Sequence, residues 1–305
     1  MQDNFKTKLI KKLEEELQIE LVSSDIPPQG MDSQVFFVKD IEGKEYAVKC
    51  YNRDEAADVI ALNLLKDNRI EIPVPKVFGT FNFEGKLILI LERINYPLLD
   101  SVSVDHIGKY VPSMIRNLQK IHKIKSSRPG LLTDIKKEKS WKEIMLHTFN
   151  DQNPNLQWDV IASREGLDKE LVLRSVQEMI QKINNTEFDE QVFSLLHTDF
   201  NQRNLFVNPN TDEITGIIDW GEAMFGDPIY DFARVRMLIW HFNLGEGVLK
   251  VYNDILYLTE KEKELEKLYW LSRVVEYLAY YSEELNGFNI GRIQMHQDFL
   301  RKYFD

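Results

Sequence analysis

The sequence predicts an α+β protein whose first part is rich in strands and whose second part is mainly helical. Up to Glu92, short apolar and β-branched runs alternate with turn residues, which is typical of antiparallel strands. From residue 111 onward, apolar residues mostly recur at the three- and four-residue spacing of helices with one buried face. With 305 residues, of which 43% are hydrophobic, the chain is large enough for one large domain or two lobes.

The first part is expected to begin with an amphipathic helix over residues 1–24. Leu9, Leu13 and Leu17 share one face of that helix, among lysines and glutamates. The polar turn that follows at 29–34 contains a single glycine, and its backbone N–H groups could face nucleotide phosphates. The remaining elements expected here are strands over 35–38, 45–51, 78–83 and 86–91 and a helix over 54–66.

The second part is expected to contain one hairpin among several amphipathic helices. The hairpin pairs residues 205–207 with 214–218 around the turn-forming residues 208–212. The spacing of apolar residues predicts helices over 111–124, 136–150, 169–185, 232–242, 248–256, 261–285 and 290–303.

Polar side chains flank this hairpin at both ends. Asp199 and Asn204 precede its first strand and Asp219 follows its second, so we expect the hairpin to bring the three together. Two carboxylates and a carboxamide supply oxygen ligands, which suit a Mg²⁺ ion that also binds substrate phosphates. The same order of residues occurs in the phosphoryl-transfer sites of protein kinases. The alternative is that Asp199 caps a helix while Asn204 and Asp219 occupy turns.

The sequence around these residues resembles the aminoglycoside phosphotransferases, a group that shares its fold with choline kinases, macrolide phosphotransferases and protein kinases. The resemblance is carried by His197–Asn204 and Ile218–Asp231, and Ile218–Asp227 is especially similar to hygromycin phosphotransferase. It implies a protein kinase-like bilobal fold. A small antiparallel-sheet lobe over 1–94 would bind the nucleotide, and a large, mainly helical lobe over 95–305 would carry catalysis and bind the acceptor.

The resemblance also implies roles around the nucleotide. Asp199 would be the base that orients the acceptor hydroxyl, while Asn204 and Asp219 would hold Mg²⁺. Lys49, which follows Ala-Val, would bind the α- and β-phosphates of ATP or GTP and pair with an acid on the next helix. The other implied positions are Asp58 or Glu55 as that acid, Ser33 near the phosphates, Glu92, Arg93 and Ile94 in the purine hinge, and His122, His197 and Asp231 as structural support.

Acids between the catalytic segment and the C-terminal helices are the candidates for binding the acceptor. They would suit a polyamine-like molecule, but acids on helix surfaces are more often simply solvated. The tyrosines at 277, 280 and 281 could face a sugar or a quaternary amine, or could pack a helix. The acidic candidates are Glu222, Asp227, Glu276, Glu283 and Glu284, of which Asp227 has the alternative role of fixing the Gly-Asp-Pro turn.

Composition narrows the classes of function. A net charge of −11 and a pI near 5.2 argue against nucleic-acid binding and favour attraction of a cationic small molecule. Cys50 is the single cysteine, so the chain can form no internal disulfide. The sequence has no apolar run of bilayer length and no signal-peptide pattern, which predicts a cytoplasmic protein, with a monomer as the default.

Three functions stay open at this point. The favoured one is a kinase that transfers the γ-phosphate of ATP or GTP to a hydroxyl of an aminocyclitol, as antibiotic-resistance enzymes do. The second is a metabolic kinase of choline, homoserine or a sugar. The third is a pseudokinase that binds nucleotide without transfer, which the joint presence of Lys49, Asp199, Asn204 and Asp219 argues against.

Overall fold

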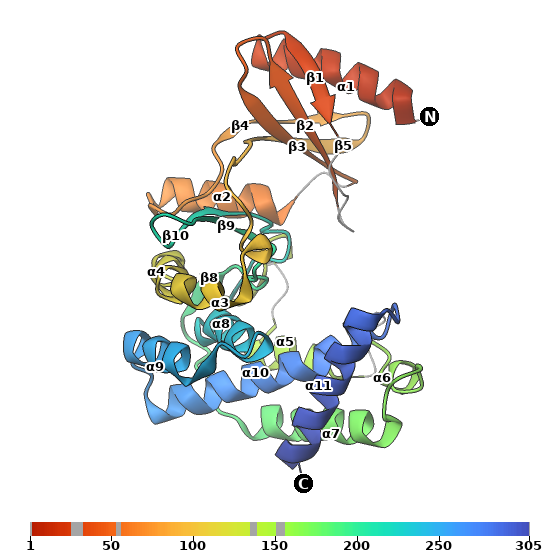
Figure 1. Ribbon diagram of the computed structural model, residues 1–305, viewed down its shortest axis with the longest axis vertical. Coiled ribbons are helices and arrows are strands. Elements are labelled where there is room, and N and C mark those ends of the chain that lie inside the picture. Colours follow the sequence, from red (N-terminus) through yellow and green to blue (C-terminus); the bar gives the residue numbers. More distant parts are fainter. Residues whose placement is uncertain (1, 26–32, 53–55, 135–138, 151–155, 305) are drawn as a thin grey trace. The chain divides into compact units, whose positions relative to one another are not determined.

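The computed structural model describes residues 2–25, 33–52, 56–134, 139–150 and 156–304 (Figure 1). The chain forms two compact units, of which the first comprises Met1–Ile121 and Asp199–Ala223 and the second His122–Thr198 and Met224–Asp305. Each unit therefore combines segments that are far apart in the sequence. The first unit extends beyond the nucleotide-binding lobe expected over 1–94, whose boundary stays a prediction.

The first unit contains a five-stranded antiparallel sheet, of which four strands were predicted and β1 was not. Its strands are β1 (Leu21–Asp25), β2 (Ser33–Asp40), β3 (Glu45–Tyr51), β4 (Val77–Phe83) and β5 (Lys86–Glu92). Their order is β1-β2-β3-β5-β4, and each neighbouring pair runs antiparallel. On β3, Val48 and Cys50 point into the core while Lys49 between them points to the opposite face. This alternation keeps the lysine out of the core.

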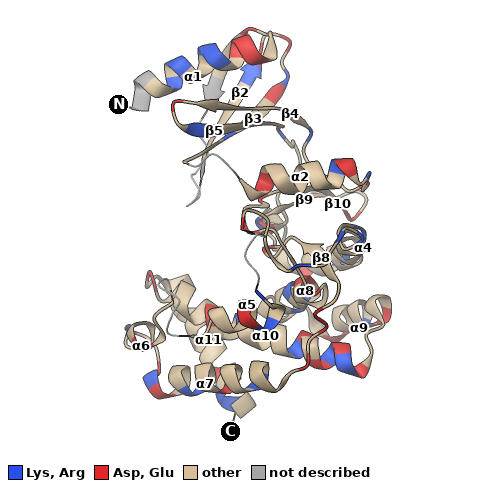
Figure 2. Cartoon of the chain, turned by 180° about the vertical axis from the view of Figure 1, so that it is seen from behind, with Lys and Arg blue, Asp and Glu red and all other residues tan. Residues whose placement is uncertain are grey.

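Helix α1 (Gln2–Leu17) packs against this sheet (Figure 1). Leu9 and Leu13 are buried in a cluster with residues of β2, β3 and β5. The lysines of α1 lie in its earlier turns and its glutamates follow at its end (Figure 2). The amphipathic helix is therefore confirmed, but its predicted end at residue 24 is wrong. Gln18 adopts a left-handed backbone with φ of 54°, which stops the helix, and Leu21–Asp25 pairs with β2 instead.

Helix α2 (Ala57–Asp67) lies beside the hairpin of β9 (Leu205–Asn208) and β10 (Glu213–Ile217), also in the first unit (Figure 1). The hairpin confirms the predicted pairing. Gly216 sits where the register shifts, and a Cβ there would lie 2.4 Å from Ile94 Cδ1. Glycine is therefore needed for the hairpin to pack against the chain that leaves β5. Residues 53–55, at the start of the helix expected over 54–66, lie outside the described residues, as does most of the expected turn at 29–34.

The N-terminal segment of the first unit ends with helix α4 (Val111–Ile121), preceded by the short helices η1 (Leu99–Ser101), α3 (Val104–Ile107) and η2 (Gly108–Tyr110). Met114, Ile115 and Leu118 of α4 are completely buried, which explains the strong apolar periodicity of this segment. The helix stops before the predicted residue 124, because the chain enters a strand at Lys125.

The second unit is mainly helical, as predicted. It contains α5 (Trp141–His147), α6 (Trp158–Ile161), α7 (Lys169–Asn185), α8 (Ile229–His241), α9 (Gly245–Leu256), α10 (Glu260–Tyr281) and α11 (Gly287–Phe304). Helix α10 packs against α7, α8 and α11 and is the centre of this unit. In the described part of the chain, no helix is both long and apolar enough to cross a membrane.

A small sheet in the second unit was not predicted. It consists of β6 (Lys125–Ser126), β8 (Phe193–Leu196), β11 (Met224–Gly226) and β7 (Gly130–Leu131), in that order. Strands this short carry no readable alternation of apolar and polar residues. Strand β8 ends directly before His197, and β11 leads into Asp227 and α8.

Candidate functional site

The hairpin β9–β10 brings Asn204 and Asp219 to the same end of the first unit. Leu205 pairs with Ile217, and just beyond this pair Ile218 N donates to Asn204 O at 3.0 Å. Asp219 follows with a left-handed backbone, φ 65°, which a residue other than glycine adopts at some cost. Its side chain is 55% exposed. The expected convergence at the end of the hairpin therefore has a clear backbone origin.

Asp199 is bound to Asn204 within the loop that leads into the hairpin. Asn204 Nδ2 donates to Asp199 Oδ2 at 2.8 Å and to the Asp199 backbone carbonyl at 2.9 Å. Because the nitrogen end of the Asn204 amide faces Asp199, its oxygen end is directed elsewhere. This oxygen forms no hydrogen bond with a described residue, so it can bind a cation.

Lys49 connects two carboxylates of the first unit. Its Nζ lies 3.0 Å from Asp58 Oδ1 and 3.1 Å from Asp219 Oδ1. Burial alone would lower the pKa of Lys49, but the charges of Asp58 and Asp219 outweigh it and raise the pKa above the ordinary value. The lysine is therefore held in its charged form, next to the residue expected to bind metal.

Asp58 is the acid that the structure pairs with Lys49, whereas Glu55 lies outside the described residues. Asp58 is 2% exposed, and its Oδ1 also accepts from Trp220 N at 3.2 Å. One short carboxylate thus joins β3, α2 and the backbone that directly follows Asp219.

Asp231, at the start of α8, organises the chain immediately before Asp199. It accepts from His122 Nε2 at 3.0 Å, from His197 N at 2.9 Å and from Thr198 N at 2.8 Å. Burial alone would raise the pKa of Asp231, but the hydrogen bond and charge of His122 and the His197 amide lower it below its ordinary value. Thr198 has a left-handed φ of 66°, so these bonds stabilise a strained turn next to Asp199.

The residues expected to surround the purine and phosphates lie at the ends of strands. Ser33 begins β2, and nothing is described of its side chain. Glu92 ends β5, and its backbone N–H donates to Lys76 O, while that of Arg93 donates to Glu45 O. The N–H of Ile94 has no hydrogen-bond acceptor among the described residues, which is compatible with the expected hinge position.

The acids expected to bind the acceptor are divided between the units: Glu222 belongs to the first and the other four to the second. Asp227 accepts from Ile229 N and from Tyr269 OH, and burial raises its pKa. Glu276 pairs with Arg273 at 2.6 Å. The other candidates, Glu222, Glu283 and Glu284, are exposed. The contacts of Asp227 match the alternative reading in which it fixes the Gly-Asp-Pro turn.

The tyrosines expected near the acceptor are divided between two environments. Tyr277 OH accepts from Arg234 Nη1 at 2.8 Å, and Tyr281 is buried. Tyr280, by contrast, is 40% exposed. Packing of helix α10 therefore accounts for Tyr277 and Tyr281.

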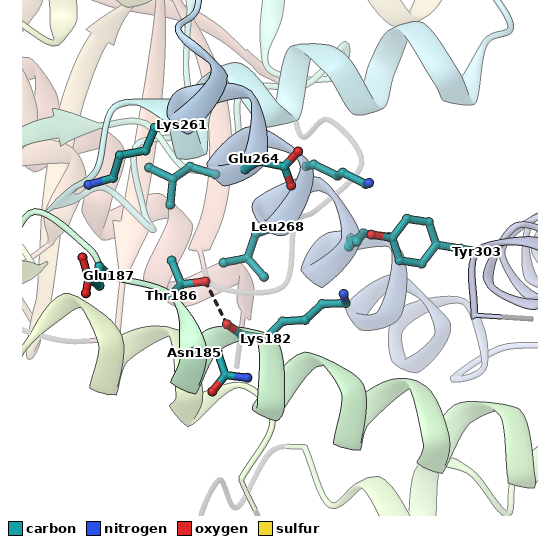
Figure 3. A pocket seen from close by; sticks show the side chains of 11 residues that line it. Lys182, Asn185, Thr186, Glu187, Lys261, Glu264, Leu268 and Tyr303 are labelled. Carbon is teal, nitrogen blue, oxygen red and sulfur yellow. Dashed lines mark hydrogen bonds between the residues drawn. The ribbon is translucent and has the colours of Figure 1, made fainter.

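A pocket of about 340 Å³ in the second unit contains none of the predicted site residues. It lies between the end of α7, the first half of α10 and the last turn of α11, and leucines and lysines line it (Figure 3). We therefore do not assign the predicted chemistry to it. In the described part of the chain, no cluster of three or more His, Cys, Asp or Glu side chains could hold a metal.

Sequence reasoning missed Asn201 and the Trp220 amide. Asn201 Nδ2 donates to Asp199 Oδ1 at 2.7 Å. Asparagine is a common turn residue, because its side chain bonds the backbone two residues further on, so nothing marked Asn201 as functional. Trp220 acts through its backbone, which no side-chain motif reveals.

Comparison with known proteins identifies the family. A family model described as the phosphotransferase enzyme family matches residues 26–267, well over half of the chain. No curated protein sequence matches. A solved structure of a thermostable mutant of aminoglycoside phosphotransferase APH(4)-Ia, in its apo form, is similar at a TM-score of 0.72 and 18% identity, over 96% of this chain and 98% of that one.

Two further solved structures share the fold at lower similarity. The AMP-bound spectinomycin phosphotransferase APH(9)-Ia has 16% identity and a TM-score of 0.66, over 96% of this chain and 94% of that one. A proposed fructosamine-3-kinase from Thermobifida fusca has 17% identity and a TM-score of 0.63, over 96% of each chain. The predicted kinase-like α+β fold and the predicted phosphotransferase with a hydroxyl acceptor are confirmed. This chain belongs to the phosphotransferase enzyme family.

Proposed function

We propose that this phosphotransferase is a small-molecule kinase that transfers the γ-phosphate of ATP or GTP to a hydroxyl of an aminocyclitol-type acceptor. The observation that carries the proposal is the position of Lys49 between Asp58 and Asp219, at the end of a hairpin whose other flank holds Asp199 and Asn204. Phosphoryl transfer needs a cation for the phosphates, oxygen ligands for a metal and a carboxylate for the hydroxyl. These five residues supply all three.

In the proposed reaction Lys49 binds the α- and β-phosphates and Asp58 keeps the lysine in place. Asp199 orients the acceptor hydroxyl toward the γ-phosphorus and takes its proton as the new P–O bond forms. The bond from the γ-phosphorus to the bridging oxygen breaks, and ADP or GDP leaves. The other residues position the reacting groups and stabilise their charge, and these two effects supply much of the rate enhancement in phosphoryl transfer.

Mg²⁺ fits the donor set that the chain offers. The Asn204 oxygen is unbonded among described residues, and Asp219 is half exposed with one oxygen shared by Lys49. Both supply the hard oxygen ligands that Mg²⁺ prefers, and neither is a sulfur or imidazole ligand. When bound there, Mg²⁺ would neutralise phosphate charge; Asn204 and Asp219 would hold it.

The choice of acceptor rests on charge and on the solved relatives. The chain's net charge of −11 favours a cationic molecule. Mutants of APH(4)-Ia were solved as ternary complexes with hygromycin B and either ADP or AMP-PNP. The similarity to a proposed fructosamine-3-kinase supports an amino sugar as the second candidate. Cytoplasmic location, a monomeric state and a role in antibiotic resistance are further parts of this proposal.

A substrate panel tests the proposal. Release of ADP or GDP is measured with Mg²⁺ and, in turn, hygromycin B, kanamycin, a macrolide, choline, homoserine and fructosamine, while a thermal shift reports nucleotide binding. We expect acceptor-dependent release with hygromycin B. Release with choline or homoserine alone would instead identify the protein as a metabolic kinase. Nucleotide binding without release for any acceptor would contradict the proposed acceptor class.

A further inference from the structure

Asn201 lies at the centre of the loop that carries Asp199. Its backbone N–H donates to Asp199 O at 2.9 Å, and its carbonyl accepts from Asn204 N at 3.1 Å. Its side-chain oxygen accepts from Arg203 N at 2.9 Å, and its side-chain nitrogen donates to Asp199 Oδ1 at 2.7 Å. The backbone N–H, backbone carbonyl, side-chain oxygen and side-chain nitrogen of Asn201 thus all form hydrogen bonds within residues 199–204.

The Arg203 amide fixes which way the Asn201 side chain points. The two ends of a carboxamide are distinguished by their hydrogen-bond partners. A backbone N–H can only donate, so the oxygen end of Asn201 must face Arg203. The nitrogen end then faces Asp199 Oδ1, which can only accept when ionised. The turn itself therefore determines that the side-chain nitrogen of Asn201, and not its oxygen, faces Asp199.

Two uncharged amides consequently bind the two oxygens of one carboxylate. Asn201 donates to Oδ1 and Asn204 to Oδ2 of Asp199. The terminal torsion of an aspartate is otherwise broad, so a donor on each oxygen fixes the plane of the group. Both amides donate to the ionised form of Asp199 without adding a formal charge beside it.

We propose that Asn201 is a positioning residue that holds the Asp199 carboxylate in the plane needed to receive the acceptor proton. This inference rests on the proposed function, because it takes Asp199 as the base. The effect of Asn201 passes through Oδ1 of Asp199.

Asn201→Asp and Gln202→Glu form a matched pair for the test. Each converts one amide of the same loop into a carboxylate. An aspartate at 201 keeps the oxygen that accepts from Arg203 N, so the turn is retained, but it places a carboxylate oxygen where the donor to Asp199 was. The Gln202 side chain forms no hydrogen bond with a described residue. Gln202→Glu therefore adds the same charge without contacting Asp199.

The first readout needs no acceptor. Carboxyl ¹³C signals of aspartates are followed against pH by NMR, and the Asp199 signal is assigned by its loss in Asp199→Asn. Two carboxylates at this separation share a proton, so in Asn201→Asp the midpoint of the Asp199 titration should rise by roughly one pH unit or more. In Gln202→Glu it should move much less. Equal midpoints in the wild type and both variants, or equal shifts in both, would overturn the inference.

The second readout is the pH dependence of single-turnover transfer from Mg·ATP to hygromycin B. The acidic limb should move toward neutral pH in Asn201→Asp and stay in place in Gln202→Glu. Asn201→Ala should lower the rate between about tenfold and a hundredfold with little change in the KM for ATP. Unchanged transfer in both Asn201 variants would contradict the positioning role. Full transfer by Asp199→Asn would instead contradict the proposed base, so the two failures are distinguishable.

Discussion

Lys49 and Asp219 are 170 positions apart in the chain, yet Lys49 Nζ lies 3.1 Å from Asp219 Oδ1. The same ammonium contacts Asp58 at 3.0 Å, but the side chain of Asp58 is only 3% exposed while that of Asp219 is 55% exposed. A buried pair is costly to break and an exposed one is not. In the proposed function, Asp219 is therefore the partner that Lys49 would exchange for a phosphate, while Asp58 would stay bound.

Removing Lys49 should destabilise the protein through Asp58. Lys49→Met leaves a buried carboxylate without its counter-charge, and we expect the free energy of unfolding to fall by about 3 kcal/mol. Asp58→Asn should cost a comparable amount, and the double variant clearly less than the sum. Urea unfolding of the four proteins measures this coupling. The exposed pair Lys250 and Asp254 provides the control, with an expected coupling of less than about 1 kcal/mol. Additive effects at 49 and 58 would contradict the assigned pair.

Asp231→Asn should damage the turn that precedes Asp199. An asparagine offers one acceptor oxygen, whereas Asp231 accepts from His122, His197 N and Thr198 N. Its NH₂ end would meet one of these donors, so we expect a loss of about 3 kcal/mol in stability and a lower kcat with little change in nucleotide affinity. Unfolding and calorimetric nucleotide titration test the two parts separately. A variant with wild-type stability and kcat would contradict the role of Asp231 in stabilising this turn.

Gly226→Ala should destabilise the small sheet of the second unit. A Cβ at Gly226 would lie 2.4 Å from Trp141 Cζ3 and 2.7 Å from Leu196 Cδ1, and both of these side chains are buried. Overpacking of this kind costs about 1–3 kcal/mol. Gly247→Ala in α9 is the matched control, because a Cβ there meets nothing within 4 Å and alanine favours a helix. Thermal unfolding should show a lower Tm for Gly226→Ala and not for Gly247→Ala. Equal Tm values would contradict the overpacking and show that the sheet relaxes around the added methyl group.

The pair of His241 and His296, of which His296 is fully buried, predicts loss of stability in mild acid. His241 Nε2 and His296 Nε2 lie 2.7 Å apart, and burial lowers the pKa of His241 to about 2 and that of His296 to about 4, from an ordinary value of 6.5. Below pH 6.5 the unfolded chain binds protons that the folded chain does not. Stability is therefore complete above that pH and declines as pH falls toward 4, by up to about 1.4 kcal/mol per pH unit for each histidine.

Urea unfolding at several pH values checks this slope. His241→Phe removes one of the two histidines that bind a proton on unfolding. The free energy of unfolding should therefore decline less steeply with falling pH, whatever the stability of the variant at neutral pH. His106→Gln removes an exposed histidine and should leave the slope unchanged. A wild-type stability that stays constant between pH 6.5 and pH 4.5 would contradict the assignment of a neutral histidine pair.

The sequence predicted the elements whose pattern is local. The bounds of α7 match the prediction because Asp168 caps its first turn by accepting from Leu171 N, a signal readable from the sequence. The hairpin after Asn204 was predicted from turn residues between two apolar runs, and its geometry brings Asn204 close to Ile218. The pairing of Lys49 with an acid on the next helix needed the family resemblance as well.

The remaining features depend on contacts between distant segments. The helix over 1–24 was drawn too long because β1 becomes a strand only by pairing with β2. The sheet of β6, β8, β11 and β7 joins strands of two to four residues, which have no period to read. The second contact of Asp58, with Trp220 N, crosses 162 positions and uses a backbone group. Acceptor binding is a matter of side-chain surroundings, which acidic positions alone do not determine.

Calorimetric titration of ATP with and without Mg²⁺ tests most directly whether Asp219 serves nucleotide binding while Asp199 serves transfer. Asp219→Asn should abolish the increase in affinity that Mg²⁺ gives the wild type. Asp199→Asn should bind Mg·ATP within about threefold of the wild type, yet lose roughly two orders of magnitude or more in acceptor-dependent turnover. Wild-type Mg·ATP affinity in Asp219→Asn, or full turnover in Asp199→Asn, would contradict the account.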